Sequence, residues 1–142
     1  MTAGGAGDRP LDGALPERSF DVTPTFVVST ALATRDFQDV HHDRDAAVRR
    51  GGKDIFLNIL TTTGLVQRYV TDWAGPSAVL GGIAIRLGAP CYPGDTLTFT
   101  GSASAFAGSA SAFAGSASGC EVSVSGRTAA GEHVAGTVRV AS

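Results

Sequence analysis

Two adjacent histidines, His41 and His42, lie in the densest group of ionisable side chains in the chain. Four aspartates accompany them within ten residues: Asp36, Asp39, Asp43 and Asp45. Histidine changes charge near neutral pH, and a nearby carboxylate can orient an imidazole or share a bound water with it. This segment is therefore where the sequence could support general acid/base chemistry.

A purely structural explanation of the same acids stays open. Asp36 could cap the N-terminus of a helix, with Asp39 three residues later, as on many solvated helices. Helical geometry separates the two explanations, because residues five apart lie roughly 140° apart around the axis. Asp36 and His41 can therefore share one water only if the backbone between them turns.

The remaining histidines and cysteines give no indication of a metal site or of a second catalytic site. Adjacent His41 and His42 cannot easily reach one ion from a helix, and no HExxH or similarly spaced set occurs, so we expect no metal site. We interpret His42 as a surface or supporting group, and His133, beside a glycine turn, as a surface strand residue. Cys91 and Cys120 are too few for a disulfide scaffold, and we expect two reduced, structural thiols.

The elements that would position these residues follow a predicted leader. Residues 1–22 carry Gly and Pro among small and polar residues without periodicity, which predicts a flexible segment. The segment PTFVVSTALA, residues 24–33, is rich in β-branched and apolar residues and predicts a buried strand. Residues 34–52 have acids early and arginines late before two glycines, which predicts a short helix ending near Arg50.

A long apolar segment, residues 55–73, contains no proline and has apolar side chains on nearly every face. A helix of this kind must be enclosed, because contact of any face with solvent would leave apolar side chains exposed. Turn residues at 90–95 and 129–132 separate predicted strands at 78–88, 95–103, 120–128 and 133–141. The sequence thus predicts a single α+β domain over residues 23–142, with antiparallel strands around one central helix.

A seven-residue repeat interrupts the predicted strands. GSASAFA occurs at 101–107 and again at 108–114, and a partial third copy ends at residue 119. Because seven is odd, Phe106 and Phe113 would face opposite sides of an ideal strand. We expect at least one copy to lie outside the regular ladder, and we interpret the low-complexity segment 101–119 as the end of an elongated hairpin, with a binding loop as the alternative.

Composition and charge exclude several classes of protein. The net charge is −2 and the basic residues are scattered, which argues against nucleic acid or an anionic membrane surface as a partner. No apolar run reaches the roughly 18 to 20 residues that cross a bilayer, and the N-terminus is unlike a signal peptide. We therefore expect a cytoplasmic protein.

The segment around the two histidines resembles a family signature. RDFQDVHHDRDAA is similar to the motif of the MaoC-like (R)-specific enoyl-CoA hydratases, G-D-x-N-P-aliphatic-H with a small residue six positions later. Four residues match that motif: Asp36, Val40, His41 and Ala47. At three other positions the motif has Gly, Asn and Pro, where this chain has Arg35, Gln38 and Asp39 respectively.

Two later segments extend this resemblance to about residues 24–141. Residues 56–75 resemble the central helix of the family, and residues 86–101 resemble its helix-packed strand, proline-rich turn and next strand. The resemblance implies a hot-dog fold, in which an antiparallel sheet wraps around one long central helix.

One branch of the family is especially similar, namely the small subunits of actinobacterial steroid side-chain enoyl-CoA hydratases. STALATRDFQDVHHDRDAA and GLVQRYVTDWAGPSA carry this likeness. It implies hydration of a cholesterol-derived CoA thioester by a two-plus-two heterotetramer with a larger MaoC-like subunit. That subunit commonly has a zinc-ribbon and oligonucleotide-fold-like domain that contacts a thiolase-like aldolase. CoA is then part of the substrate, and no cofactor is expected.

The resemblance also implies roles for individual residues. Asp36 and His41 would hold the attacking water and divide the acid and base roles between them, with the division left open. A backbone N–H at the start of the central helix, at Asn58, would bind the enolate oxygen. The family usually has Gly after His there, whereas this chain has Asn58 after Leu57. We interpret Tyr69 and Trp73 as core or interface residues, in preference to a place in the substrate wall.

Three other functions stay open. A hot-dog acyl-CoA thioesterase usually places a catalytic carboxylate on or near the central helix, and residues 55–71 contain none. A non-catalytic scaffold subunit would leave the chemistry to its partner. Dehydration of an acyl carrier protein thioester would share the fold, and substrate assays would separate it from CoA-thioester hydration.

Overall fold

The computed structural model describes residues 12–107 and 118–141. Within these ranges, five strands form one antiparallel sheet with the order β1-β3-β4-β5-β2. The strands are β1 (Gly13–Asp21), β2 (Val79–Leu87), β3 (Thr96–Ala107), β4 (Ser118–Thr128) and β5 (Gly131–Ala141). Edge strands β1 and β2 therefore lie at opposite sides of the sheet.

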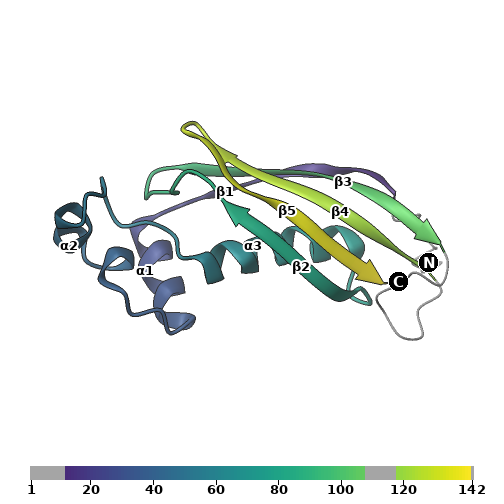
Figure 1. Ribbon diagram of the computed structural model, residues 1–142, viewed down its shortest axis with the longest axis horizontal. Coiled ribbons are helices and arrows are strands. Elements are labelled where there is room, and N and C mark those ends of the chain that lie inside the picture. The colour runs from purple at the N-terminus through teal and green to yellow at the C-terminus, as the bar shows by residue number, and fades with distance from the viewer. Residues whose placement is uncertain (1–11, 108–117, 142) are drawn as a thin grey trace, which may run out of the picture.

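The helices of the described ranges are α1 (Pro24–Ala33), the 3-10 turn η1 (Asp39–His41), α2 (Arg44–Arg49) and α3 (Ile59–Ala74). Helix α3 lies along one face of the sheet, whereas α1 and α2 gather at one end of the molecule (Figure 1). A long helix held against an antiparallel sheet confirms the predicted α+β architecture. None of the helices described in these ranges is long and apolar enough to cross a bilayer.

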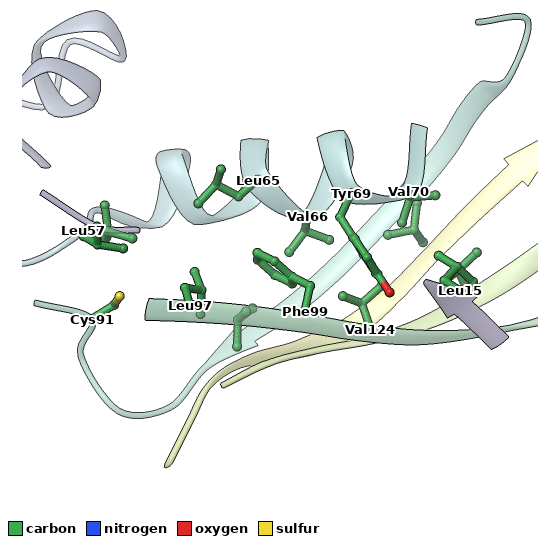
Figure 2. Packing of buried hydrophobic residues seen from close by; sticks show 14 of the residues in the cluster. Leu15, Leu57, Leu65, Val66, Tyr69, Val70, Cys91, Leu97, Phe99 and Val124 are labelled. Carbon is green, nitrogen blue, oxygen red and sulfur yellow. The ribbon is translucent and has the colours of Figure 1, made fainter. Parts of the chain in front are cut away.

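The core lies between α3 and the sheet (Figure 2). Val66 and Tyr69 of α3 pack toward Leu97 and Phe99 of β3 and Val124 of β4, and each of these side chains is at most 4% exposed. Tyr69 stacks on Phe99 with ring centroids 5.5 Å apart. Burying a side chain of this size contributes about 1.5 to 3 kcal/mol, so these contacts hold α3 on the sheet. Tyr69 is a core residue, as predicted.

The predicted strand at residues 24–33 is instead helix α1, so that prediction was wrong. Thr23 caps the helix by accepting a hydrogen bond from the Phe26 N–H over 3.0 Å, and Pro24 lies in the first turn, where a missing N–H is tolerated. Thr30 donates back to the Phe26 carbonyl oxygen over 2.7 Å. The β-branched composition favoured a strand, but the Thr-Pro pair was the stronger local signal.

Residues 13–21 form β1, so the prediction of a flexible leader over residues 1–22 is wrong for this stretch; residues 1–11 lie outside the described ranges. β1 pairs with β3, and the register shifts at a bulge beside Pro16. The Tyr69 hydroxyl donates to the Pro16 carbonyl oxygen over 3.0 Å. A proline and a bulge suit an edge strand, and they also interrupt the alternation by which strands are predicted.

The central helix is confirmed, but it begins at Ile59, four residues later than predicted, and it is not enclosed on every side. The side that faces the sheet is buried, whereas Ile59 and Leu60 in its first turn are each 51% exposed. A single sheet face covers only one side of a helix. The sheet of this chain therefore supplies only part of the predicted enclosure.

The four predicted strands correspond to β2, β3, β4 and β5. β3 extends to Ala107, so the first GSASAFA copy belongs to the sheet and pairs with β4 from Gly101 opposite Val124 to Ala107 opposite Ser118. The second copy, residues 108–114, lies outside the described ranges.

His133 is 2% exposed, so its prediction as a surface residue was wrong. Its Nδ1 donates to the Ala89 carbonyl oxygen over 2.7 Å, and its Nε2 lies 2.9 Å from the Thr62 hydroxyl of α3. Both ring nitrogens are thus satisfied inside the protein, which allows a histidine at a core position. Burial lowers the pKa of His133.

Cys91 and Cys120 are both fully buried and unpaired, as predicted for structural thiols. Burial raises the pKa of the Cys91 thiol to about 12. A thiol that stays protonated at neutral pH is a poor nucleophile, so Cys91 acts as a small apolar core residue.

Candidate active site

The C-terminal end of α1 places Asp36. The Arg35 N–H donates to the Leu32 carbonyl oxygen over 3.0 Å, and the Asp36 N–H donates to that of Ala31 over 2.9 Å, which is the pattern of a Schellman motif. Arg35 accordingly has a left-handed backbone with φ 56°. Asp36 therefore follows a helix, and the alternative that it caps one is wrong; the cap of α2 is Asp43.

His41 lies in the η1 turn and is 6% exposed. Its Nδ1 is 2.7 Å from the Phe56 carbonyl oxygen. Because a carbonyl oxygen can only accept, Nδ1 carries a proton and donates. The Phe56 ring lies edge-on to the imidazole with centroids 4.9 Å apart, and the Phe56 N–H bonds to the Val40 carbonyl oxygen over 3.3 Å. These contacts determine the tautomer and the orientation of the ring.

The structure brings Asp36 and His41 together. Nε2 of His41 lies 3.4 Å from Oδ2 of Asp36, because the backbone between them turns and does not continue as a helix. This distance exceeds the roughly 2.7 to 3.2 Å of a good N–H···O bond. Both atoms can therefore contact one water molecule, and a proton can pass between that water and either side chain.

Asn58 lies at the N-terminus of α3, beside the pair, and is 3% exposed. Its Oδ1 accepts from the Thr61 N–H over 3.0 Å and so caps the helix. Its Nδ2 donates to Asp36 Oδ2 over 3.1 Å and to Thr34 Oγ1 over 2.8 Å. Sequence reasoning missed these side-chain contacts. The available signal was an asparagine directly before a long helix, since asparagine is a preferred N-cap residue.

The rest of the predicted acidic and histidine group points elsewhere. His42 is exposed, as predicted. Asp39 forms a two-point ion pair with Arg50, with distances of 2.8 Å to Nε and 2.9 Å to Nη2. The hydrogen bond from Arg50 lowers the pKa of Asp39. This pair ties η1 to the end of α2 and so supports the turn that carries His41.

An open depression of about 410 Å³ lies beside the segment that joins Asp36 to His41. Its lining residues are Phe37, Gln38, Asp39, Val40 and Arg50. Phe37 is 66% exposed, so this part of the surface offers an apolar ring together with charged groups.

Aromatic contacts lead from the site toward the surface. The rings of Phe56 and Tyr92 lie 6.5 Å apart, and the Lys53 ammonium lies 4.9 Å from the centroid of Tyr92. Trp73, at the other end of α3, is partly buried against the core, as predicted. Among the residues that the structure describes, no three His, Cys, Asp or Glu side chains gather as metal ligands.

Comparison with known proteins places this architecture in a family. A sequence model described as MaoC like domain matches residues 9–111. The chain therefore belongs to the MaoC-like family, and its antiparallel sheet and central helix are the hot-dog fold of that family.

Three individual relatives show how similar this chain is to particular members of the family. The chain is 57% identical over 130 residues to the 3-oxo-4,17-pregnadiene-20-carboxyl-CoA hydratase beta subunit of Mycobacterium tuberculosis, covering 92% of this chain and 94% of the relative. It matches a chain in the crystal structure of the ChsH1-ChsH2 complex from Mycobacterium tuberculosis with a TM-score of 0.83 and 54% identity, covering 94% of this chain and 98% of that one. The (R)-hydratase from A. caviae involved in PHA biosynthesis shares the fold, with a TM-score of 0.78 at 16% identity and coverage of 96% and 98%.

Proposed function

We propose that this chain is the small subunit of a heteromeric enoyl-CoA hydratase that adds water across the 2,3 double bond of a steroid side-chain enoyl-CoA. One observation supports this proposal above all others. His41 Nε2 lies 3.4 Å from Asp36 Oδ2, beside the start of α3. The relative that is 57% identical is named a hydratase of 3-oxo-4,17-pregnadiene-20-carboxyl-CoA, which supports a steroid thioester as the substrate.

The proposed reaction uses the two side chains as a proton-transfer pair. An enoyl thioester is electrophilic at its β carbon, and hydration needs a positioned water, a base, an acid and donors for the enolate oxygen. The water oxygen bonds to the β carbon while the Asp36–His41 pair takes one of its protons. The electron pair of the C=C bond moves toward the thioester oxygen, and the pair then delivers a proton to the α carbon. No redox change occurs, so we propose no cofactor besides the CoA portion of the substrate.

We propose that the enolate oxygen meets N–H groups at the start of α3, with that of Asn58 among them. The first N–H groups of a helix have no intrahelical acceptor and carry the positive end of the helix dipole. One donor of this kind is typically worth about 10²- to 10³-fold in kcat. The placement of Asn58 at the N-cap, next to Asp36, supports this role.

The proposed partner is a larger MaoC-like subunit. A relative described as a beta subunit and a matching structure of a two-protein complex support a heteromer. Both edge strands contain a register shift, but β1 also contains Pro16, whereas β2 has no proline and is apolar and glycine-rich, with Val79 60% exposed. An exposed apolar edge without proline is suited to pairing with another chain.

The finer features of the assembly are also part of the proposal. The larger subunit would carry a zinc-ribbon and oligonucleotide-fold-like domain, and two copies of each subunit would form a heterotetramer. That domain would contact a thiolase-like aldolase. We place the complex in the cytoplasm, together with its acyl-CoA substrate.

The direct test is co-expression with the larger subunit, followed by a hydration assay on a steroid enoyl-CoA. We expect Asp36→Asn and His41→Gln each to lower kcat by about 10²-fold or more, the range for loss of a general acid or base. His42→Gln, at an exposed neighbouring position, is the matched control. Unchanged rates in the first two variants would favour a scaffold subunit, and release of free CoA by the unsubstituted complex would favour a thioesterase.

A further inference from the structure

The Asn58 side chain is held in one orientation by the chemistry of its neighbours. The Thr61 N–H can only donate, so it faces the amide oxygen at 3.0 Å. An ionised carboxylate can only accept, so Asp36 Oδ2 faces the amide nitrogen at 3.1 Å. Because Asn58 is 3% exposed, water competes little for these bonds.

Thr34 completes this network. Its hydroxyl donates to the Thr30 carbonyl oxygen of α1 over 2.8 Å, which uses its one hydrogen. A lone pair of Thr34 Oγ1 then accepts from Asn58 Nδ2 over 2.8 Å. Asn58 therefore ties the end of α1, from which Asp36 emerges, to the first turn of α3.

Hydrogen bonds from two segments determine the orientation of the Asp36 carboxylate relative to His41. Its Oδ1 accepts from the Gln38 N–H over 3.3 Å, and its Oδ2 accepts from Asn58. The same Oδ2 is the atom that lies 3.4 Å from His41 Nε2. Two donors from separate segments thus set the carboxylate plane and leave Oδ2 able to contact His41 or a shared water.

We propose that the Asn58 side chain is a positioning residue for the Asp36 carboxylate, in addition to being the cap of α3; this inference rests on the proposed hydration. A cap requires only an acceptor, which Asp or Ser supplies as well as Asn. The amide nitrogen is the part that reaches Asp36. Thr23 caps α1 through its hydroxyl oxygen alone. Capping a helix and donating a hydrogen bond to Asp36 are therefore separate roles in this chain.

The test compares Asn58→Asp and Asn58→Ser in the co-expressed complex with a steroid enoyl-CoA. Both variants keep a cap acceptor, and both lose the amide donor. We expect kcat to fall about 10- to 100-fold with KM changed less than about twofold, because misplacing a reacting group by about 1 Å can cost about 100-fold. We also expect the acidic limb of the pH profile of kcat/KM to move to higher pH in Asn58→Asp, since two carboxylates then face each other.

Thr23→Ala is the control for loss of a helix cap without contact to the site; it should lower Tm and leave kcat and the pH profile unchanged. A kcat within about twofold of the unsubstituted complex in both Asn58 variants would overturn the inference. So would equal losses of kcat in the Thr23 and Asn58 variants. If Asn58→Asp fails to assemble, Asn58→Ser decides. An unaffected rate in Asp36→Asn would instead overturn the proposed function.

Discussion

The Asp36 N–H donates to the Ala31 carbonyl oxygen over 2.9 Å, and this bond sets the direction from which the carboxylate enters the site. To make it, the intervening Arg35 adopts a left-handed backbone with φ 56°. That conformation costs roughly 1 to 2 kcal/mol for a residue with a Cβ. The chain thus accepts backbone strain directly beside the candidate catalytic pair, as is common at functional sites.

Replacing Arg35 by glycine should stabilise the protein. Glycine adopts the left-handed region without strain, but it loses more backbone entropy on folding, so we expect a net gain of roughly 0.5 to 1 kcal/mol. Urea unfolding of the assembled protein measures the change. The control is Arg49→Gly at the end of α2, where a helical φ makes glycine unfavourable by up to about 1 kcal/mol. A lower stability for Arg35→Gly would contradict this account of the turn.

Protonation of His133 should make stability depend on pH. Burial lowers its pKa in the folded protein below the ordinary 6.5, so the unfolded chain binds a proton first as the pH falls. This contribution to the free energy of unfolding is therefore fully present above about pH 6.5 and is lost as the pH falls toward the lowered value. His133→Gln can keep both hydrogen bonds and should flatten the slope. Equal slopes for the two proteins would refute the assignment.

Two adjacent threonines in α3, Thr61 and Thr62, allow the effect of removing a buried hydroxyl to be compared with and without a hydrogen-bond partner. Thr61 Oγ1 is buried and has no hydrogen-bond partner among the described residues, whereas the Thr62 hydroxyl bonds to His133. Removing an unsatisfied hydroxyl relieves a desolvation penalty, so Thr61→Val should be neutral or stabilising by about 1 kcal/mol. Thr62→Val should instead cost about 1 to 3 kcal/mol, because it leaves a ring nitrogen unpaired. Similar losses for both variants, measured by thermal unfolding, would show that Thr61 also has a partner.

A methyl group at Gly136 of β5 should disturb the pairing with β2. A Cβ there would collide with the Ala84 backbone oxygen, and backbone cannot rotate away as a side chain can. We expect Gly136→Ala to cost about 1 to 3 kcal/mol, as overpacking typically does, and to weaken assembly through β2. Gly64→Ala in α3 is the control, since nothing lies within 4 Å of its added methyl. Normal assembly of Gly136→Ala would argue against β2 as the pairing edge.

Local patterns accounted for most of the fold. Strands β2 to β5 and helix α3 could be predicted because alternation, apolar runs and turn residues act over a few neighbouring positions. Helix α1 and strand β1 were missed where two local signals conflicted. In α1, the β-branched residues suggested a strand although the Thr-Pro start favours a helix, and in β1 a proline with a bulge broke the alternation.

For the candidate site too, the sequence predicted some features, and tertiary packing decided the others. The resemblance to the MaoC-like signature identified Asp36 and His41, and helical geometry showed that a turn between them was needed. Whether that turn forms depends on a Schellman motif at Arg35 and on a carbonyl oxygen of Phe56, 15 positions beyond His41. The contact of Asn58 with Asp36 spans 22 positions, and that of His133 with Thr62 spans 71. Such contacts arise only when separate segments are packed together, because a hydrogen bond requires atoms to meet within about 3 Å, and linear order does not specify which distant atoms will do so.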